Sequence, residues 1–304
     1  MNAKGKLKKL VLHTFSKENI IKLLLQACAI TTILVTLGIV YILISEALLF
    51  FKEVSFWKFI SETEWTPLFP NAKYGILPLV CGTLLVTVIA LSVAVPIGLT
   101  IAIYLSEYAS IRTKKIIKPL LEILAAIPTV VYGFFALVVV TPFLQEFIPS
   151  LEVFNALSAG LVMGIMIIPF VSSLSEDALS SVPGSLREAS YGLGATKFQT
   201  AFKVVLPAAT SGVTVSIILA LSRAVGETMI VAIAAGQHPK LTADPTVAIE
   251  TITGYIVQVC LGDVPHASIE YKTIFVAGLT LFVITYLMNN LSFIIKRKFK
   301  EEYE

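Results

Sequence analysis

Six long apolar segments constrain this chain more than any other feature of its sequence. They are separated by more polar, charged segments and cover residues 23–51, 76–105, 119–144, 156–174, 208–235 and 273–295. A segment of about 20 apolar residues crosses a bilayer as a helix, and a helix satisfies its own backbone hydrogen bonds there. Only 14% of the residues are charged, against about 25% in soluble domains, and the mean hydropathy is +0.86. We therefore predict an all-α membrane protein with six transmembrane helices.

The distribution of positive charge predicts how these helices are oriented. If the N-terminus is cytoplasmic, the inner segments hold 17 lysines and arginines and the outer loops hold 5, and Arg223 inside the fifth apolar segment completes the total of 23. Cytoplasmic segments carry the excess of positive charge in membrane proteins. Both termini are therefore expected in the cytoplasm, as tails of residues 1–22 and 296–304 around a membrane domain of residues 23–295. The first apolar segment is longer than that of a signal peptide, so we expect it to be retained.

Composition argues against several kinds of site. The three cysteines and the three histidines are far apart in the sequence, so we predict neither a disulfide framework nor a metal site. The net charge of +3 indicates no nucleic-acid partner. The sequence also lacks the glycine-rich loop that cradles nucleotide phosphates. We therefore expect no bound cofactor, no catalytic residues and no enzymatic activity in this chain. As a membrane protein, it is expected to contact membrane lipids.

The inner segment at 181–207 is too long for a simple connector, so it is expected to fold. Ser185 and Glu188 have the spacing of a capping box, which predicts the start of a short helix. Gly192 and Gly194 are expected to end this helix in left-handed backbone conformations, which cost glycine little.

A second helix is predicted in the same inner segment. Thr196 and Gln199 repeat the capping-box spacing, and the helix is expected to stop before Pro207 because proline lacks a backbone N–H. Its Phe198, Phe202 and Val205 have the spacing of one apolar stripe. The pattern favours a helix–turn–helix that projects from the membrane, and the alternative is an amphipathic loop that lies on the bilayer.

The same segment carries a recognisable motif. Glu188, Ala189, Gly194, Leu206 and Pro207 stand at the spacing E-A-(x4)-G-(x11)-L-P, which resembles the "EAA" signature of ABC importer permeases, with Ser190 in place of the second alanine. The resemblance implies that this loop couples the chain to a separate subunit that binds and hydrolyses ATP with Mg. The residues expected in the coupling loop are Ser185, Arg187, Glu188, Ala189, Gly192, Gly194, Leu206 and Pro207.

The fifth apolar segment contains an arginine and a glutamate, Arg223 and Glu227. A charge at this depth is costly, by about 2.5–3.5 kcal/mol for arginine, and usually lines a pathway. The separation of four residues predicts that both side chains share one helical face, along which Ser216 also lies. One interpretation is an internal ion pair that stabilises helix packing. The other is an oxyanion site in a translocation path, because a guanidinium matches phosphate oxygens bidentately.

In the pathway interpretation, Glu227 holds Arg223 when the site is empty and accepts a hydrogen bond from a phosphate hydroxyl. Pro128 and Pro169 lie inside the third and fourth segments, where proline favours a kink. They are interpreted either as hinges or as ordinary prolines of membrane helices. Tyr132 and Ser216 are further pathway candidates.

Resemblance extends over most of the chain. The stretches LLEILAAIPTVVYGFFAL (120–137), GLVMGIMIIPFVSSLSEDALSSVP (160–183) and LSRAVGETM (221–229) resemble the PstC-type phosphate permeases. This implies the type I ABC importer fold in a bacterial cytoplasmic membrane, with inorganic phosphate as cargo and with Arg223 and Glu227 as functional residues. It also implies a heterodimer with a PstA-type permease, two PstB-type ATP-binding subunits and an extracytoplasmic PstS-type phosphate-binding protein.

Other functions remain open on the sequence. The same architecture serves other oxyanions, such as sulfate, molybdate or phosphonate. An anion channel or secondary transporter that needs no ATP, and a membrane scaffold with no pathway, are the alternatives from other classes. The coupling signature argues against both of these.

Overall fold

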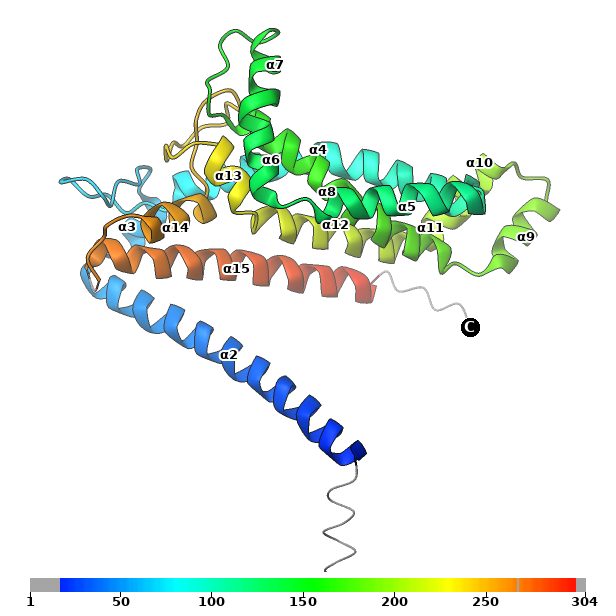
Figure 1. Ribbon diagram of the computed structural model, residues 1–304, viewed down its shortest axis with the longest axis horizontal. Helices are drawn as coiled ribbons and strands as arrows, with labels where there is room; N and C mark the ends of the chain where they lie inside the picture. Colours follow the sequence, from blue (N-terminus) through cyan, green and yellow to red (C-terminus); the bar gives the residue numbers. More distant parts are fainter. Residues whose placement is uncertain (1–16, 267, 299–304) are drawn as a thin grey trace, which may run out of the picture.

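The computed structural model describes residues 17–266 and 268–298, and this part of the chain is built from helices (Figure 1). Within the described ranges, the only β-bridge is an isolated antiparallel one between Trp65 and Tyr74. The longer helices are α2 (Lys17–Glu53), α4 (Leu77–Ile103), α5 (Ile111–Ala126), α8 (Ala156–Ser180), α12 (Thr210–Val225) and α15 (Ile269–Lys298). The shorter ones are α3 (Phe56–Ser61), α6 (Thr129–Phe135), α7 (Thr141–Gln145), α9 (Gly184–Gly192), α10 (Lys197–Thr200), α11 (Leu206–Ala208), α13 (Met229–Ala234) and α14 (Ile252–Leu261). Three π-helical turns complete the set: η1 (Tyr104–Tyr108), η2 (Ala136–Val140) and η3 (Ala201–Val205).

The apolar segments are helical, as the hydropathy pattern predicts, but not every predicted span is one continuous helix. Four described helices are long and apolar enough to cross a membrane, or up to six if each of two bent pairs counts as one span. The predicted tails 1–22 and 296–304 overlap the ends of α2 and α15, and residues 1–16 and 299–304 lie outside the described residues.

The third predicted span is broken where proline stops the first half. Helices α5 and α6–α7 meet at 85° across Ile127 and Pro128. The Leu124 carbonyl would bond to the N–H of residue 128 in a continuous helix, and proline has none. The Tyr132 hydroxyl donates to this carbonyl instead, at 2.7 Å. Of the two interpretations of Pro128, the kink is the one that the structure shows, as a full break, so the third predicted span, 119–144, is wrong as a single helix. Pro169 is an ordinary proline of a membrane helix, because α8 runs unbroken through it.

The fifth predicted span, 208–235, is wrong as a single helix. Helix α12 ends at Val225, and α13 begins only at Met229. Gly226 is the residue at which α12 ends, with a backbone close to φ −88° and ψ 0°. The amino end of α12 is also bent, by 72° relative to the helical segment Lys197–Ala208.

Helices α4 and α8 form the centre of the molecule. Their interface is lined by small residues, which let two backbones approach closely in a membrane. A Cβ atom at Gly164 would lie 2.7 Å from the carbonyl oxygen of Ala90, so glycine is needed there. Ala90, Ala159 and Met163 belong to the main buried cluster.

The two ends of this bundle are different (Figure 1). One end carries α9 and α10 and the carboxyl end of α15. The other carries α3, α13 and α14 with the loops before α4 and before α14. Helix α2 packs beside α15 and diverges from the bundle toward its amino end.

Candidate functional site

A cavity of about 290 Å³ lies among the membrane helices and contains ionisable side chains. Helix α12 contributes Arg223, α5 contributes Lys118 and Glu122, and α8 contributes Glu176 and Phe170. The remaining lining residues are Leu105, Leu121, Ala125, Met166, Pro169 and Ser173. The cavity thus combines two cations with two carboxylates inside an apolar wall.

Arg223 is exposed toward this cavity, near the carboxyl end of α12. Its guanidinium carbon lies 5.7 Å from the centroid of the Phe170 ring, a cation–π contact between α12 and α8. Among the described residues it has no ion pair and no hydrogen bond to its guanidinium. The donors of Arg223 are therefore available to an anion that enters the cavity.

Lys118 is the second cation of the cavity and is already paired. Its Nζ lies 2.5 Å from the Glu176 carboxylate, and Lys114 lies 3.7 Å from the same group. The Glu176 side chain is only 5% exposed, while the two lysines are partly in solvent. The sequence did not predict that Lys118, Glu122 and Glu176 share a site, because the first two lie on α5 and Glu176 lies far along the chain on α8. The available signal was the acidic pair Glu176 and Asp177 on an otherwise apolar helix.

Glu227 does not share a helical face with Arg223, so that prediction is wrong. It follows the end of α12, and its Oε1 accepts hydrogen bonds from the backbone N–H groups of Met229 at 3.1 Å and Ile230 at 3.4 Å. These are free donors at the start of α13. Glu227 therefore caps α13, and the described residues show no ion pair between it and Arg223.

The two further pathway candidates lie in packed positions. Ser216 is 1% exposed, and its hydroxyl is 2.6 Å from that of Ser175 on α8. Tyr132 is 6% exposed and is bound to the Leu124 carbonyl. Neither residue lines the cavity around Arg223.

The inner loop folds as two helices joined by a tight turn, as predicted, but its first cap differs. Helix α9 begins at Gly184 after Pro183, with no side-chain cap. The Ser185–Glu188 capping box is therefore wrong, because the N-cap is Pro183, two residues earlier, and Ser185 falls inside the first turn. The second capping box, between Thr196 and Gln199, is confirmed.

The turn between these helices needs one left-handed residue. Gly194 has φ +84°, as predicted, whereas Gly192 is the last helical residue of α9. The prediction that the second helix stops before Pro207 is also wrong. The chain remains helical to Ala208, and the wider π-helical turn η3 accommodates the proline ring.

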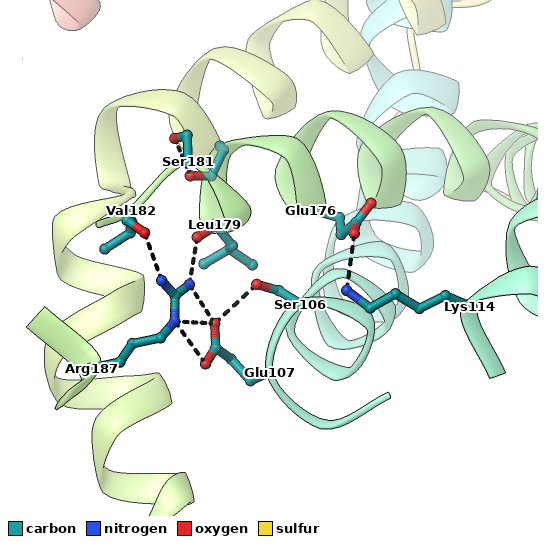
Figure 2. A network of polar contacts seen from close by, with 9 residues as sticks. Ser106, Glu107, Lys114, Glu176, Leu179, Ser181, Val182 and Arg187 are labelled. Carbon is teal, nitrogen blue, oxygen red and sulfur yellow. Dashed lines mark hydrogen bonds and ion pairs between the residues drawn. The ribbon is translucent and has the colours of Figure 1, made fainter. Parts of the chain in front are cut away.

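Arg187 joins three elements beneath this loop (Figure 2). Its Nη2 lies 2.8 Å from the Glu107 carboxylate on η1 and 2.9 Å from the Leu179 carbonyl of α8. Its Nη1 donates to the Val182 carbonyl at 2.6 Å. A displacement of α9 would therefore act directly on the ends of α4 and α8.

Ser190, which departs from the family signature, also has a structural role. Its hydroxyl lies 2.9 Å from that of Thr200, and both side chains are buried between α9 and α10. Leu206 and Val205 pack in the adjoining apolar cluster.

The outer face of the loop is exposed and partly apolar. Leu193 is 91% exposed and Phe198 is 62% exposed. Glu188 and Ala189 are exposed on α9, and Glu188 has no ion pair within the described part of the chain. This face presents one carboxylate beside apolar side chains at the end of the molecule.

Sequence comparisons relate the chain to membrane transport proteins. The family model described as "Binding-protein-dependent transport system inner membrane component" matches residues 94–301. The "Probable ABC transporter permease protein YqgH" of Bacillus subtilis is 35% identical over 88% of this chain and 86% of the relative. The "Phosphate transport system permease protein PstC" of Haemophilus influenzae is 34% identical over 94% of this chain and 96% of the relative.

Solved structures share the fold. A bacterial ABC transporter involved in the import of the acidic polysaccharide alginate aligns with a TM-score of 0.64 at 18% identity, over 97% of this chain and 100% of that chain. The MetNI methionine ABC transporter in an inward-facing conformation aligns with a TM-score of 0.54 at 20% identity, over 75% of this chain and 95% of that chain.

Proposed function

We propose the function of this chain from one premise: it belongs to the family of binding-protein-dependent transport system inner membrane components. It is a multi-pass membrane protein with the fold of a type I ABC importer permease. We propose that its cargo is inorganic phosphate, which is the cargo named for several of its relatives.

One observation supports Arg223 as the residue that contacts the cargo in the pathway. Arg223 presents a guanidinium without an anionic partner to a cavity inside the membrane region. A planar guanidinium binds phosphate oxygens through paired N–H donors. The cavity therefore contains a group suited to an oxyanion at a depth where an unpaired charge is costly.

The charge balance of the cavity suits transient rather than tight binding. Arg223 and Lys118 are opposed by Glu122 and Glu176, and Lys118 is already bound to Glu176. A transport site must let its cargo leave as well as enter. The ion pair between Lys118 and Glu176 leaves Arg223 as the principal contact for phosphate.

The inner loop offers a surface for a separate subunit that would supply the energy for transport. The chain has no nucleotide-binding loop, and the exposed face around Glu188, Ala189 and Leu193 is available to an ATP-binding subunit. ATP and Mg would be bound by that subunit. Arg187 would transmit its movement to α4 and α8 through Glu107, Leu179 and Val182.

We propose the remaining partners and the orientation on the same premise. One permease offers one side of a pathway, so a PstA-type second permease would complete it, with two PstB-type ATP-binding subunits and a PstS-type phosphate-binding protein. The α9–α10 end would face the cytoplasm together with both termini, in agreement with the positive charge of the inner segments.

The test is uptake of labelled phosphate into proteoliposomes that hold the complete complex and ATP. Arg223→Gln should lower uptake at least about tenfold, because hydrogen bonds to charged groups contribute about 1.5–3 kcal/mol. Uptake by the Arg223→Lys complex should lie between that of wild type and that of Arg223→Gln, because lysine keeps the charge without the planar donors. The control is Arg112→Gln, an exposed arginine at the start of α5 that does not line the cavity.

Normal uptake by the assembled Arg223→Gln complex would remove Arg223 from the pathway. Competition with sulfate, molybdate and phosphonate in the same assay tests the cargo. Stronger competition by one of these anions than by unlabelled phosphate would reassign it.

A further inference from the structure

A second pocket, of about 560 Å³, lies at the end of the molecule opposite α9 and α10. It is formed by the turn after Trp65, by the segment that follows α13, and by α14. Its walls include Phe69 and Tyr255, and its rim includes His238 and Lys240. The pocket is separate from the Arg223 cavity, with which it shares no lining residue.

The wall of this pocket is partly a buried aromatic core. Trp65 is 1% exposed, and its ring meets the Tyr255 ring edge-on at 5.0 Å. The Tyr255 hydroxyl is in turn 2.6 Å from that of Thr273 on α15. These contacts hold the wall of the pocket in place.

Glu250 is the unusual residue of this pocket. It is 1% exposed, and its Oε1 has no hydrogen-bond partner among the described residues. Its backbone is fixed against α4, because a Cβ atom at Gly82 would lie 2.2 Å from the Glu250 carbonyl oxygen. A buried polar atom without a partner costs about 1–3 kcal/mol, so this carboxyl is a candidate for binding a ligand.

The charges around Glu250 indicate the sign of that ligand. Burial raises the pKa of Glu250 to about 8, so its carboxyl carries a proton near neutral pH and donates a hydrogen bond. Burial also raises the pKa of the Tyr255 phenol, which stays neutral. His238 and Lys240 are the other ionisable residues that line the pocket, and α4 carries no charged side chain. The pocket therefore has the ammonium of Lys240 at its rim, with the Asp244 carboxylate in the same loop, and a neutral donor at its floor.

We propose that this outer pocket binds a tetrahedral oxyanion, with the buried, otherwise unpartnered Glu250 carboxyl forming a hydrogen bond to it and Lys240 supplying the opposite charge. A neutral carboxyl and a cation together favour an anion, whereas an ionised Glu250 would repel it. The use of inorganic phosphate as probe rests on the proposed function. A phospholipid headgroup offers the same chemistry and is the alternative source.

Equilibrium binding of radiolabelled phosphate to the full chain in detergent micelles free of phospholipid tests this site. Wild type should bind at about pH 7 and lose about tenfold in affinity at about pH 9, because the protonated fraction of Glu250 falls as the pH rises through its pKa. Glu250→Gln keeps a neutral donor at both pH values. It should retain binding and show only the change caused by the ionisation of phosphate itself.

Two further variants complete the comparison. Glu250→Ala and Lys240→Gln should each weaken binding about tenfold at about pH 7. Binding of glycerophosphocholine in place of free phosphate, with the same dependence on Glu250 and Lys240, would assign the site to a lipid headgroup. The inference is overturned if neither ligand binds, if Glu250→Ala binds as wild type does, or if Glu250→Gln keeps the full pH dependence.

Arg223→Gln separates this inference from the proposed function. It should bind phosphate at the outer pocket with wild-type affinity, while uptake by its complex falls at least about tenfold. Normal transport by Arg223→Gln would refute the proposed pathway and leave the outer pocket standing. Unaltered binding in Glu250→Ala and Lys240→Gln would refute the outer pocket and leave the pathway standing.

Discussion

The Arg187 guanidinium lies 2.8 Å from the Glu107 carboxylate, although 80 positions separate the two residues in the chain. The Glu107 side chain is 5% exposed and that of Arg187 is 20% exposed. This ion pair ties the first helix of the inner loop to the end of α4.

Arg187→Ala should destabilise the protein and uncouple phosphate uptake from ATP hydrolysis. Removing one partner of a buried ion pair costs about 3 kcal/mol, and α9 would lose its ion pair with η1, the turn that follows α4. We expect a lower thermal midpoint and continued ATP hydrolysis with reduced phosphate uptake. The matched control is Arg112→Ala, and an unchanged ratio of uptake to hydrolysis in Arg187→Ala would contradict the coupling role.

Leu193→Asp tests the exposed face of the inner loop. Leu193 is 91% exposed, so the substitution should leave folding intact. A central apolar contact contributes about 2 kcal/mol or more to an interface, so co-purification of the ATP-binding subunit should fall at least about tenfold. Leu261→Asp is the control, because Leu261 is 83% exposed at the opposite end of the bundle. Equal recovery of the subunit by both variants would place the interface elsewhere.

Glu176→Gln should strengthen phosphate binding in the cavity. The change removes the carboxylate that holds Lys118 at 2.5 Å, so a second cation becomes available to the cargo. We expect the KM for uptake to fall about threefold to tenfold and maximal uptake to fall with it, because release slows. The exposed Glu146→Gln should leave both values unchanged. A KM that does not fall in Glu176→Gln would show that Lys118 is not restrained by this pair.

Glu227→Ala should lower stability without altering selectivity. Loss of a cap acceptor costs about 1 kcal/mol, and the Glu227 carboxylate is directed at Met229 and Ile230. Glu227→Gln keeps an acceptor oxygen and should lower the stability less than Glu227→Ala does. The measurements are the thermal midpoint and competition between phosphate and sulfate. A loss of discrimination between these anions in either variant would show that Glu227 contacts the cargo.

Local patterns predicted a large part of this molecule. Apolar length identified the spans, and the Thr196–Gln199 capping box and the left-handed Gly194 are confirmed because each depends on residues within one or two turns. Proline alone did not decide where a helix breaks: the chain breaks at Pro128 but α8 continues through Pro169.

The sequence by itself thus determined the class of the protein, the apolar segments that can span a membrane and the helical inner loop. The tertiary structure alone decided that Glu227 caps α13 instead of pairing with Arg223, that Lys118 is bound to Glu176, and that Glu250 and Lys240 line one outer pocket. The reason is physical: hydropathy and capping are properties of neighbouring residues. Ion pairs and pockets arise where helices far apart in the chain pack together, and no periodicity within one helix records which residues of another will face it.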